Sequence, residues 1–368
     1  MHALFFLLLL TQNAAFCDGS REPASSTQRD PTSREPKAEV ISGSATKPLS
    51  PHHGSGVEPH FSIYFDLLLA NQPGKANFSF LNFHPLLFFE ILPTPEIQFA
   101  FEVRSDPRYF ELDYQITPTI QVRAGKIWIP FDDMNPHNIY GGRIDTSRMR
   151  LGGDFFLPDI WTDLGVGAKI TLAEKAAVTS EAYVYAVNGI PQQSGVTMPS
   201  FADQSVSVTD NNSDKALGAR FHFLFARVFG LGVSFYTARW NNEAAANDTP
   251  LRLSMAGLDA QLRMGNTSVK LGTIGMWVGL PGDLTYRRHG AYLEFSEKFS
   301  DVWRFYLRGG EIDTDDRLTD ANDVVLVGGG LAYKPGVVQL SLDYQQDIKT
   351  VPGKLGYSFT SARIAVQL

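Results

Sequence analysis

The sequence predicts an all-β protein, a transmembrane antiparallel up-and-down β-barrel of about 16 strands, within a range of roughly 14–18. From His60 onward apolar and polar residues alternate, which is typical of strands with one apolar and one polar face. Many of these segments run for about nine to twelve residues, the length that a tilted membrane-spanning strand requires. The gaps between them alternate between short and long, as periplasmic turns and extracellular loops do.

The first 17 residues are expected to form a secretory signal peptide. An apolar run from Ala3 to Leu10 is too short to span a bilayer as a helix, and small residues follow it. Cleavage after Cys17 would follow a small-x-small pattern that begins at Ala15. The alternative is a lipoprotein acylated at Cys17, which the bulky Phe16 disfavours. No other stretch approaches the roughly 18 apolar residues of a membrane helix, so we expect an exported protein without one.

Residues 18–59 are expected to form a disordered periplasmic leader. Ser, Pro, Thr and isolated charges dominate this segment, which has almost no aromatic residues. Such a composition buries too little apolar surface to offset the entropy lost on ordering. A short plug or a contact with peptidoglycan would suit this position, but no residue demands either.

The bulk composition argues against a nucleic-acid partner, an internal disulfide framework and a cysteine-based zinc site. The formal net charge of −7 and the pI of about 5.6 argue against a nucleic-acid-binding protein, which normally carries a basic face. Cys17 is the only cysteine, so the chain has neither an internal disulfide framework nor a cysteine-based zinc site. Aromatic residues are frequent at 12% while the mean hydropathy is nearly neutral at −0.12, a combination that suits two faces in different solvents.

Residues 60–368 are expected to form the barrel. Alternation is clear at residues 96–104, 110–116, 220–225, 303–308, 338–345 and 361–368. The tight gaps lie near Pro93, at residues 117–118, 173–175, 265–266 and 334–336, and the long ones at residues 127–160, 190–214, 241–250, 313–321 and 347–356. A soluble β-sandwich also has alternating strands, but it has no reason to separate short and long connections so regularly.

Only a closed barrel pairs every backbone group in lipid, so the apolar faces are expected to meet lipid and the polar faces a water-filled lumen. Burying the many inward arginines in a dry core would be costly for each unpaired ion. The predicted pore-lining residues are Glu102, Arg104, Glu111, Asp113, Arg123, Arg220, His222, Glu294, Arg304, Arg308, Asp343 and Arg363. Arginines would favour anions, but acids alternate with them, so charges paired along the wall are an equal alternative. The glycine clusters at 165–167, 230–232 and 328–330 are expected to relieve crowding between strands.

One stretch resembles a family of porin-like Gram-negative outer-membrane barrels, phosphate-selective or general. The matching motifs are residues 111–114, Thr117-Pro118, residues 123–126, Pro130-Phe131, Asn135, His137 and residues 158–167. Two positions depart from the family pattern: Asp132 stands where Gly usually follows Pro-Phe, and the chain ends in Leu368 rather than Phe. The resemblance implies a passive or weakly selective pore for anions or small organic solutes.

Residues 127–160 are the longest candidate for a loop that folds inward and narrows the channel. The segment is rich in apolar residues for a loop in water. The alternative is that it packs on the barrel rim or at a subunit interface. Its charges would form a ring that tunes selectivity. The predicted constriction residues are Trp128, Phe131, Asp132, Asp133, Arg143, Asp145, Arg148 and Arg150.

The sequence therefore favours a porin of the cell outer membrane for passive diffusion of small hydrophilic solutes or ions. The alternatives are a plug-less receptor for a ligand such as a siderophore and, less favoured, a barrel enzyme such as a lipase. No serine lies at a recognisable elbow beside His222 or His289, so no enzyme, catalytic residue or cofactor is predicted. Expected partners are outer-membrane lipid, lipopolysaccharide, the barrel-assembly machinery and small solutes or ions. A homotrimer is one of the oligomeric states left open.

No metal site is predicted. The acidic stretch at residues 313–323 lacks the Gly and the terminal Glu of an EF-hand loop. We expect a solvated external loop that binds divalent ions loosely beside lipopolysaccharide. None of the glycine clusters opens a helix, so they are not nucleotide-binding loops.

Overall fold

The computed structural model describes residues 56–71, 79–103, 109–132, 157, 161–175, 177–192, 199, 212–242, 249–282, 284–313, 315–317, 323–349 and 358–367. All of these residues belong to one compact unit, Ser42–Leu368. The expected signal peptide and residues 18–55 of the expected leader lie outside them, as do Arg104, Asp133, Arg143, Asp145, Arg148, Arg150 and Leu368.

The described residues form strands joined by turns and loops. The strands are β1 (Gly56–Asn71), β2 (Ser79–Thr94), β3 (Ile97–Glu102), β4 (Phe110–Thr117), β5 (Ile120–Trp128), β6 (Thr162–Lys175), β7 (Val178–Val187), β8 (Ala216–Phe225), β9 (Phe229–Arg239), β10 (Arg252–Met264), β11 (Thr267–Leu280), β12 (Leu284–Lys298), β13 (Trp303–Asp313), β14 (Val324–Tyr333), β15 (Val338–Lys349) and β16 (Ser358–Gln367). In this part of the chain, no helix is long and apolar enough to cross a membrane.

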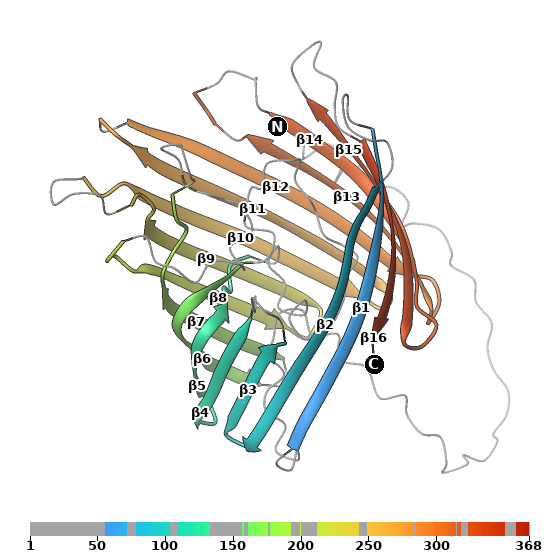
Figure 1. The fold of residues 1–368 in the computed structure, drawn as a ribbon, viewed down its shortest axis with the longest axis horizontal. Coiled ribbons are helices and arrows are strands. Elements are labelled where there is room, and N and C mark those ends of the chain that lie inside the picture. Colours follow the sequence, from blue (N-terminus) through green and yellow to red (C-terminus); the bar gives the residue numbers. More distant parts are fainter. Residues whose placement is uncertain are drawn as a thin grey trace, which may run out of the picture. The chain divides into compact units, whose positions relative to one another are not determined.

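Each strand pairs antiparallel with its neighbours in sequence, and β1 pairs with β16, so that the sheet closes into a barrel (Figure 1). Phe65 lies opposite Ile364 in the closing pair. Closure leaves no unpaired edge, which is the condition for strands in hydrocarbon. The predicted fold class is confirmed. Strand β1 begins at Gly56, four residues before the expected start at His60.

The connections differ in length between the two ends of the barrel. The turns that follow even-numbered strands are short; Gly265, between β10 and β11, and Gly336, between β14 and β15, have φ angles of 59° and 71°, which favour glycine. Long connections follow β5 and β7 at the other end. One connection at that end is short: residues 281–283 join β11 to β12.

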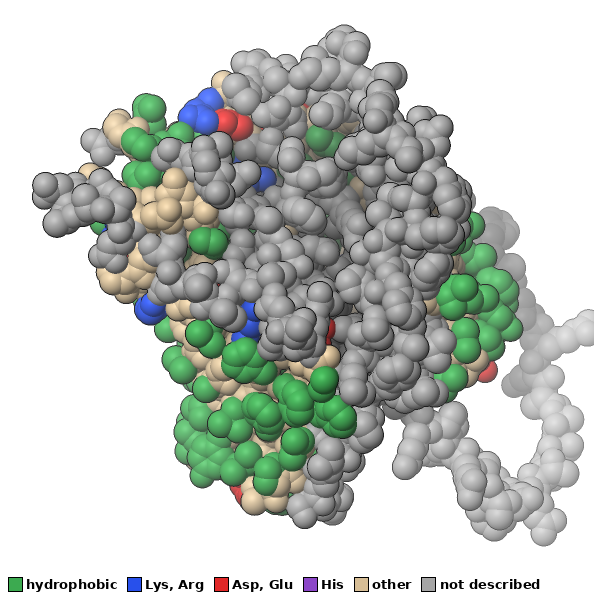
Figure 2. Space-filling model, viewed as in Figure 1, with side chains coloured by type: hydrophobic (Ala, Val, Ile, Leu, Met, Phe, Trp, Pro, Cys, Tyr) green, Lys and Arg blue, Asp and Glu red, His purple; other side chains and the backbone are tan. Residues whose placement is uncertain are grey.

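Along the middle of the strands the large outward side chains are apolar. Leu258 and Leu307 are 48% and 55% exposed, whereas their neighbours Asp259 and Arg308 are buried. Hydrophobic side chains gather over β3–β5 in the lower part of Figure 2. Aromatic rings stack near the short turns, for example Phe299 against Trp303. An apolar outer band with an aromatic girdle suits a surrounding of lipid.

The interior differs from the expectation of a polar inner wall in one respect. Toward the long loops, inward positions of β7–β14 are apolar and pack together with parts of the loops into one buried cluster. Its members are Ile127, Ile129, Phe131, Leu157, Trp161, Tyr185, Val187, Ile190, Ala216, Tyr236, Ala238, Trp240, Leu251, Leu253, Met255, Ile274, Met276, Val278, Tyr286, Ile312 and Leu326. We call this set the interior apolar cluster. Because apolar side chains there contact one another rather than water, this part of the interior is a packed core.

Candidate constriction site

The chain changes direction at the end of β5, where the Gly-Lys motif lies. Gly125 has a φ of 122°, and a Cβ there would collide with the carbonyl oxygen of Phe110. This conformation is open to glycine but strained for other residues. Beyond it, the successive residues Ile127 and Trp128 are both fully buried. The Trp128 amide donates to a carboxylate oxygen of Glu111 at 3.3 Å, which holds the end of the strand against β4.

The next residues lead the chain into the barrel interior. The Ile129 amide donates to the Trp161 carbonyl at 3.1 Å, and the Phe131 amide donates to the Ile129 carbonyl at 2.9 Å. The Phe131 ring lies 5.5 Å from the ring of Trp161, which meets Tyr236 of β9 edge-on at 5.1 Å. Since β5 and β9 are not neighbours in the sheet, these rings meet across the interior. The start of the long loop is thus part of the interior apolar cluster.

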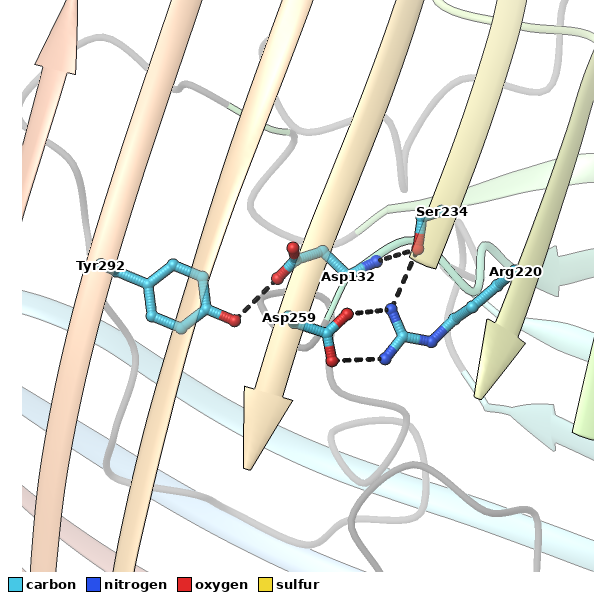
Figure 3. A network of polar contacts seen from close by, with 5 residues as sticks. All are labelled: Asp132, Arg220, Ser234, Asp259 and Tyr292. Carbon is cyan, nitrogen blue, oxygen red and sulfur yellow. Dashed lines mark hydrogen bonds and ion pairs between the residues drawn. The ribbon is translucent and has the colours of Figure 1, made fainter. Parts of the chain in front are cut away.

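Asp132 connects this loop start to two further strands (Figure 3). Its amide donates to the Ser234 hydroxyl of β9 at 3.0 Å, and one carboxylate oxygen accepts from the Tyr292 hydroxyl of β12 at 2.8 Å. In the strand order β12 lies seven positions from β5 in a barrel of sixteen strands, so the contact reaches the opposite wall. Asp132 has a φ of 55°. Asp tolerates this left-handed conformation, so the turn persists without the glycine of the resembling family.

Ser234 also joins Asp132 to a buried ion pair. Arg220 of β8 donates to the two carboxylate oxygens of Asp259 on β10 at 2.7 and 2.8 Å, and to the Ser234 hydroxyl at 3.0 Å. Figure 3 shows the guanidinium facing the carboxylate in a two-pronged arrangement. Such bidentate pairs fix the orientation of both groups. Strands β8, β9, β10 and β12 therefore hold the loop start through one network, Asp132–Ser234–Arg220–Asp259 with Tyr292.

Glycines on the inner wall make room for this network. A Cβ at Gly257 on β10 would lie 3.3 Å from the Asp132 carboxylate and 3.4 Å from the Phe131 ring. A Cβ at Gly232 would collide with Asp259, and one at Gly272 would collide with the Tyr292 ring. The expectation that glycines relieve crowding is confirmed at Gly232.

Other wall charges are also paired. Arg123 pairs with Glu111 and lies 3.5 Å from Asp113, and its guanidinium is 5.7 Å above the Trp128 ring. Two more inward pairs are Lys169–Glu181 at 2.7 Å and Arg308–Asp343 at 3.4 Å. Among the described residues, therefore, several expected pore arginines face acids on the same wall. This matches the alternative of internally paired wall charges.

The remaining predicted residues are scattered round the wall. Glu102 and Glu294 are buried, and His222 and Arg304 are half-buried. Arg363 lies in β16 with its backbone opposite Ser341. Sequence reasoning missed Ser234, Asp259 and Tyr292. Asp259 follows the same alternation as the predicted set, so a complete strand-by-strand reading would have included it.

The acidic segment after β13 is held by local contacts. The Arg317 guanidinium donates to both carboxylate oxygens of Asp315 at 2.8 and 2.6 Å, which lowers the pKa of Asp315 below the usual aspartate value. The Asp315 amide donates to Asp313 at 2.9 Å. Within the described parts of the chain, no group of three or more His, Cys, Asp or Glu side chains could hold a metal ion.

Comparison with solved structures shows the same fold. No family model matches the sequence, and no curated protein matches it. OmpF of Salmonella typhi, in complex with daunomycin, is 10% identical with a TM-score of 0.60, over 86% of this chain and 98% of its own. The anion-selective porin from Comamonas acidovorans is 9% identical with a TM-score of 0.55, over 86% of this chain and 100% of its own. The trimer form of OmpT from Vibrio cholerae is 10% identical with a TM-score of 0.56, over 86% and 100%. The chain therefore shares the β-barrel fold of these outer-membrane proteins.

Proposed function

We propose that this protein is a porin of the cell outer membrane, through which small hydrophilic solutes or ions diffuse passively. The observation that carries the proposal is the placement of the loop start. Ile129, Phe131 and Asp132 lie inside the barrel, and Asp132 contacts β9 and β12. A loop held across the interior narrows any pathway along the barrel axis. The rest of the loop, to residue 160, continues this constriction in our proposal.

The similar solved structures support a channel. They include an anion-selective porin and OmpF, and one is described as a trimer form. By analogy we propose a homotrimer. Part of the interior is not filled by the interior apolar cluster. There the inner wall carries charged residues, among them Glu102, Arg304 and Arg308, which would provide polar groups for hydrated solutes. The leader and the signal peptide remain expectations that accompany export to this membrane.

Planar-bilayer conductance of the refolded, purified protein tests the proposal. We expect stable ohmic current steps, and a reversal potential in a salt gradient that reports the ion preference. A variant that lacks residues 131–158 should give larger steps, because the constriction is removed. If neither protein conducts, the channel is excluded and a ligand receptor becomes the better explanation.

A further inference from the structure

Strands β10, β12 and β13 carry exposed charged or titratable side chains on their outward face, beyond the apolar band. On β10 the outward residue Leu258 is followed, toward the long loops, by the exposed Arg252. On β12 the outward Leu293 is followed by the exposed His289 and Arg287. Outward charges are costly within hydrocarbon and tolerated near its boundary. These arginines therefore mark where the outer surface leaves the hydrocarbon.

Trp277 fixes the level of this boundary. It faces outward on β11, is 42% exposed, and lies between Ser254 of β10 and Arg287 of β12 in register. Tryptophan is enriched where membrane meets water, with its ring at the level of the lipid headgroups. Arg287 lies beside Trp277 on the neighbouring strand and therefore at the same level. Arg252 lies two residues beyond Ser254, the partner of Trp277 on β10, toward the long loops.

Both guanidinium groups are available. Among the described residues, neither Arg252 nor Arg287 has an ion-pair partner within 4.0 Å. The neighbouring acids have other contacts: Asp313 lies 3.8 Å from His289, Asp315 binds Arg317, and Asp316 accepts the backbone amide of Arg287. Glu311 is exposed on the outward face of β13, nearer the apolar band.

The spacing of the two arginines suits a ligand with more than one phosphate. Their strands are separated by β11, so the backbones are about 10 Å apart across the sheet. Arginine binds phosphate through a planar pair of N–H donors. Basic groups at a membrane surface attract anionic lipid headgroups over this range.

We propose that Arg252 and Arg287 form a binding surface for the diphosphorylated headgroup of lipopolysaccharide. Charge complementarity selects this occupant, since the surface lies at headgroup level on the side of the long loops, which face outward from the cell. The proposal rests on the outer-membrane location in the proposed function and is independent of conduction. A protein that does not conduct can still be tested for it.

Native mass spectrometry of the refolded full-length protein in neutral detergent gives the test. Diphosphorylated lipid A is compared with the same lipid freed of both phosphates, in the presence of a chelator that removes bridging divalent ions. We expect the phosphorylated lipid to bind preferentially. The double variant R252Q/R287Q should bind it about tenfold more weakly or worse. The matched control is R227Q, which removes an exposed arginine at the short-turn end and should bind as the unaltered protein does.

Three results of the binding measurement would overturn the proposal. They are equal binding of the two lipids, unchanged binding by R252Q/R287Q, and an equal loss in R227Q. A change in subunit number in the double variant would overturn it as well, because the surface would then be a contact between copies. Because both side chains are exposed, folding should survive, and unchanged heat-modifiable gel mobility verifies it. The variant R252K/R287K keeps the positive charges and should retain most of the lipid binding. The conclusion then does not depend on the R252Q/R287Q variant alone.

Discussion

Asp132 combines two properties that are separable by mutation. Its backbone adopts a left-handed turn, and its carboxylate accepts a hydrogen bond from the Tyr292 hydroxyl on the opposite wall. Position 132 was predictable as a constriction residue because it follows the Pro-Phe motif. Its partners were not, since Ser234 and Tyr292 are 102 and 160 residues away and only the register of a closed barrel brings them together.

Replacing Tyr292 with Phe removes the hydroxyl and leaves the ring. We expect the loop start to lose part of its anchor, because a hydrogen bond to a charged group contributes about 1.5–3 kcal/mol. Single-channel recordings should show increased open-channel noise and larger conductance. Tyr306→Phe is the matched control, because the Tyr306 hydroxyl is buried on the same wall and makes no hydrogen bond among the described residues. Equal traces for both variants would contradict an anchoring role of Tyr292.

Asp132→Gly and Asp132→Ala distinguish the turn from the carboxylate. Both variants lose the contact with Tyr292, so both should show the altered conductance of Tyr292→Phe. Only Ala is strained in the left-handed turn, at a cost of about 1 kcal/mol. The urea midpoint should therefore be lower for Asp132→Ala than for Asp132→Gly. The same midpoint in both would show that the turn relaxes without cost.

The Arg220–Asp259 pair is buried, so breaking it should be costly. Asp259→Asn leaves the guanidinium without its charged partner, and we expect a loss of about 3–5 kcal/mol in unfolding free energy. The double variant R220M/D259L removes both charges and should recover much of that loss, measured by urea titration.

Asp315→Asn is the comparison with a partly exposed pair. The side chain of Arg317 is 43% exposed and that of Asp315 is 11% exposed. We expect a smaller loss than at Asp259, because ion pairs that reach solvent contribute less. The lowered pKa of Asp315 means that its pair stabilises the fold above the ordinary aspartate pKa. That contribution disappears as the pH falls through the lowered value.

At the scale of strands, alternation predicted the membrane faces but not the interior apolar cluster. On β7 the run Ala182–Val187 contains no charged residue, and both of its faces are apolar. An alternation with period two then defines two faces of the strand, but it does not show which face meets lipid and which packs in the interior. The lengths of the connections predicted which end carries the loops. They did not predict that Phe131 would pack against Gly257, because this contact depends on the position of a loop relative to a distant strand.

Gly257→Val on β10 should displace the loop start. The side chain would occupy the space beside Asp132 and Phe131, where even a Cβ is tightly placed. We expect a lower urea midpoint together with altered conductance. Gly309→Val on β13 is the matched control, because a Cβ there would meet only the Leu326 carbonyl at an ordinary 3.6 Å. Comparable effects of the two valines would argue against a specific contact at Gly257.

For the whole molecule, closure between β1 and β16 makes a global prediction. A closed barrel keeps its hydrogen bonds in sodium dodecyl sulfate until it is heated, so the unheated protein should migrate differently on gels from the boiled one. An unheated band of about three times the monomer mass would support the proposed trimer. Identical migration before and after boiling would contradict a closed barrel.

When the protein unfolds in detergent, the outer apolar band and the interior apolar cluster differ in how their hydration changes. The outer band is covered by detergent both before and after unfolding, so the hydration of its apolar side chains changes little. The side chains of the interior apolar cluster would become hydrated, as the core of a globular protein does. Their hydration raises the heat capacity and the denaturant slope. Calorimetry should therefore record a heat-capacity increment of unfolding that a barrel with a wholly polar lumen would lack.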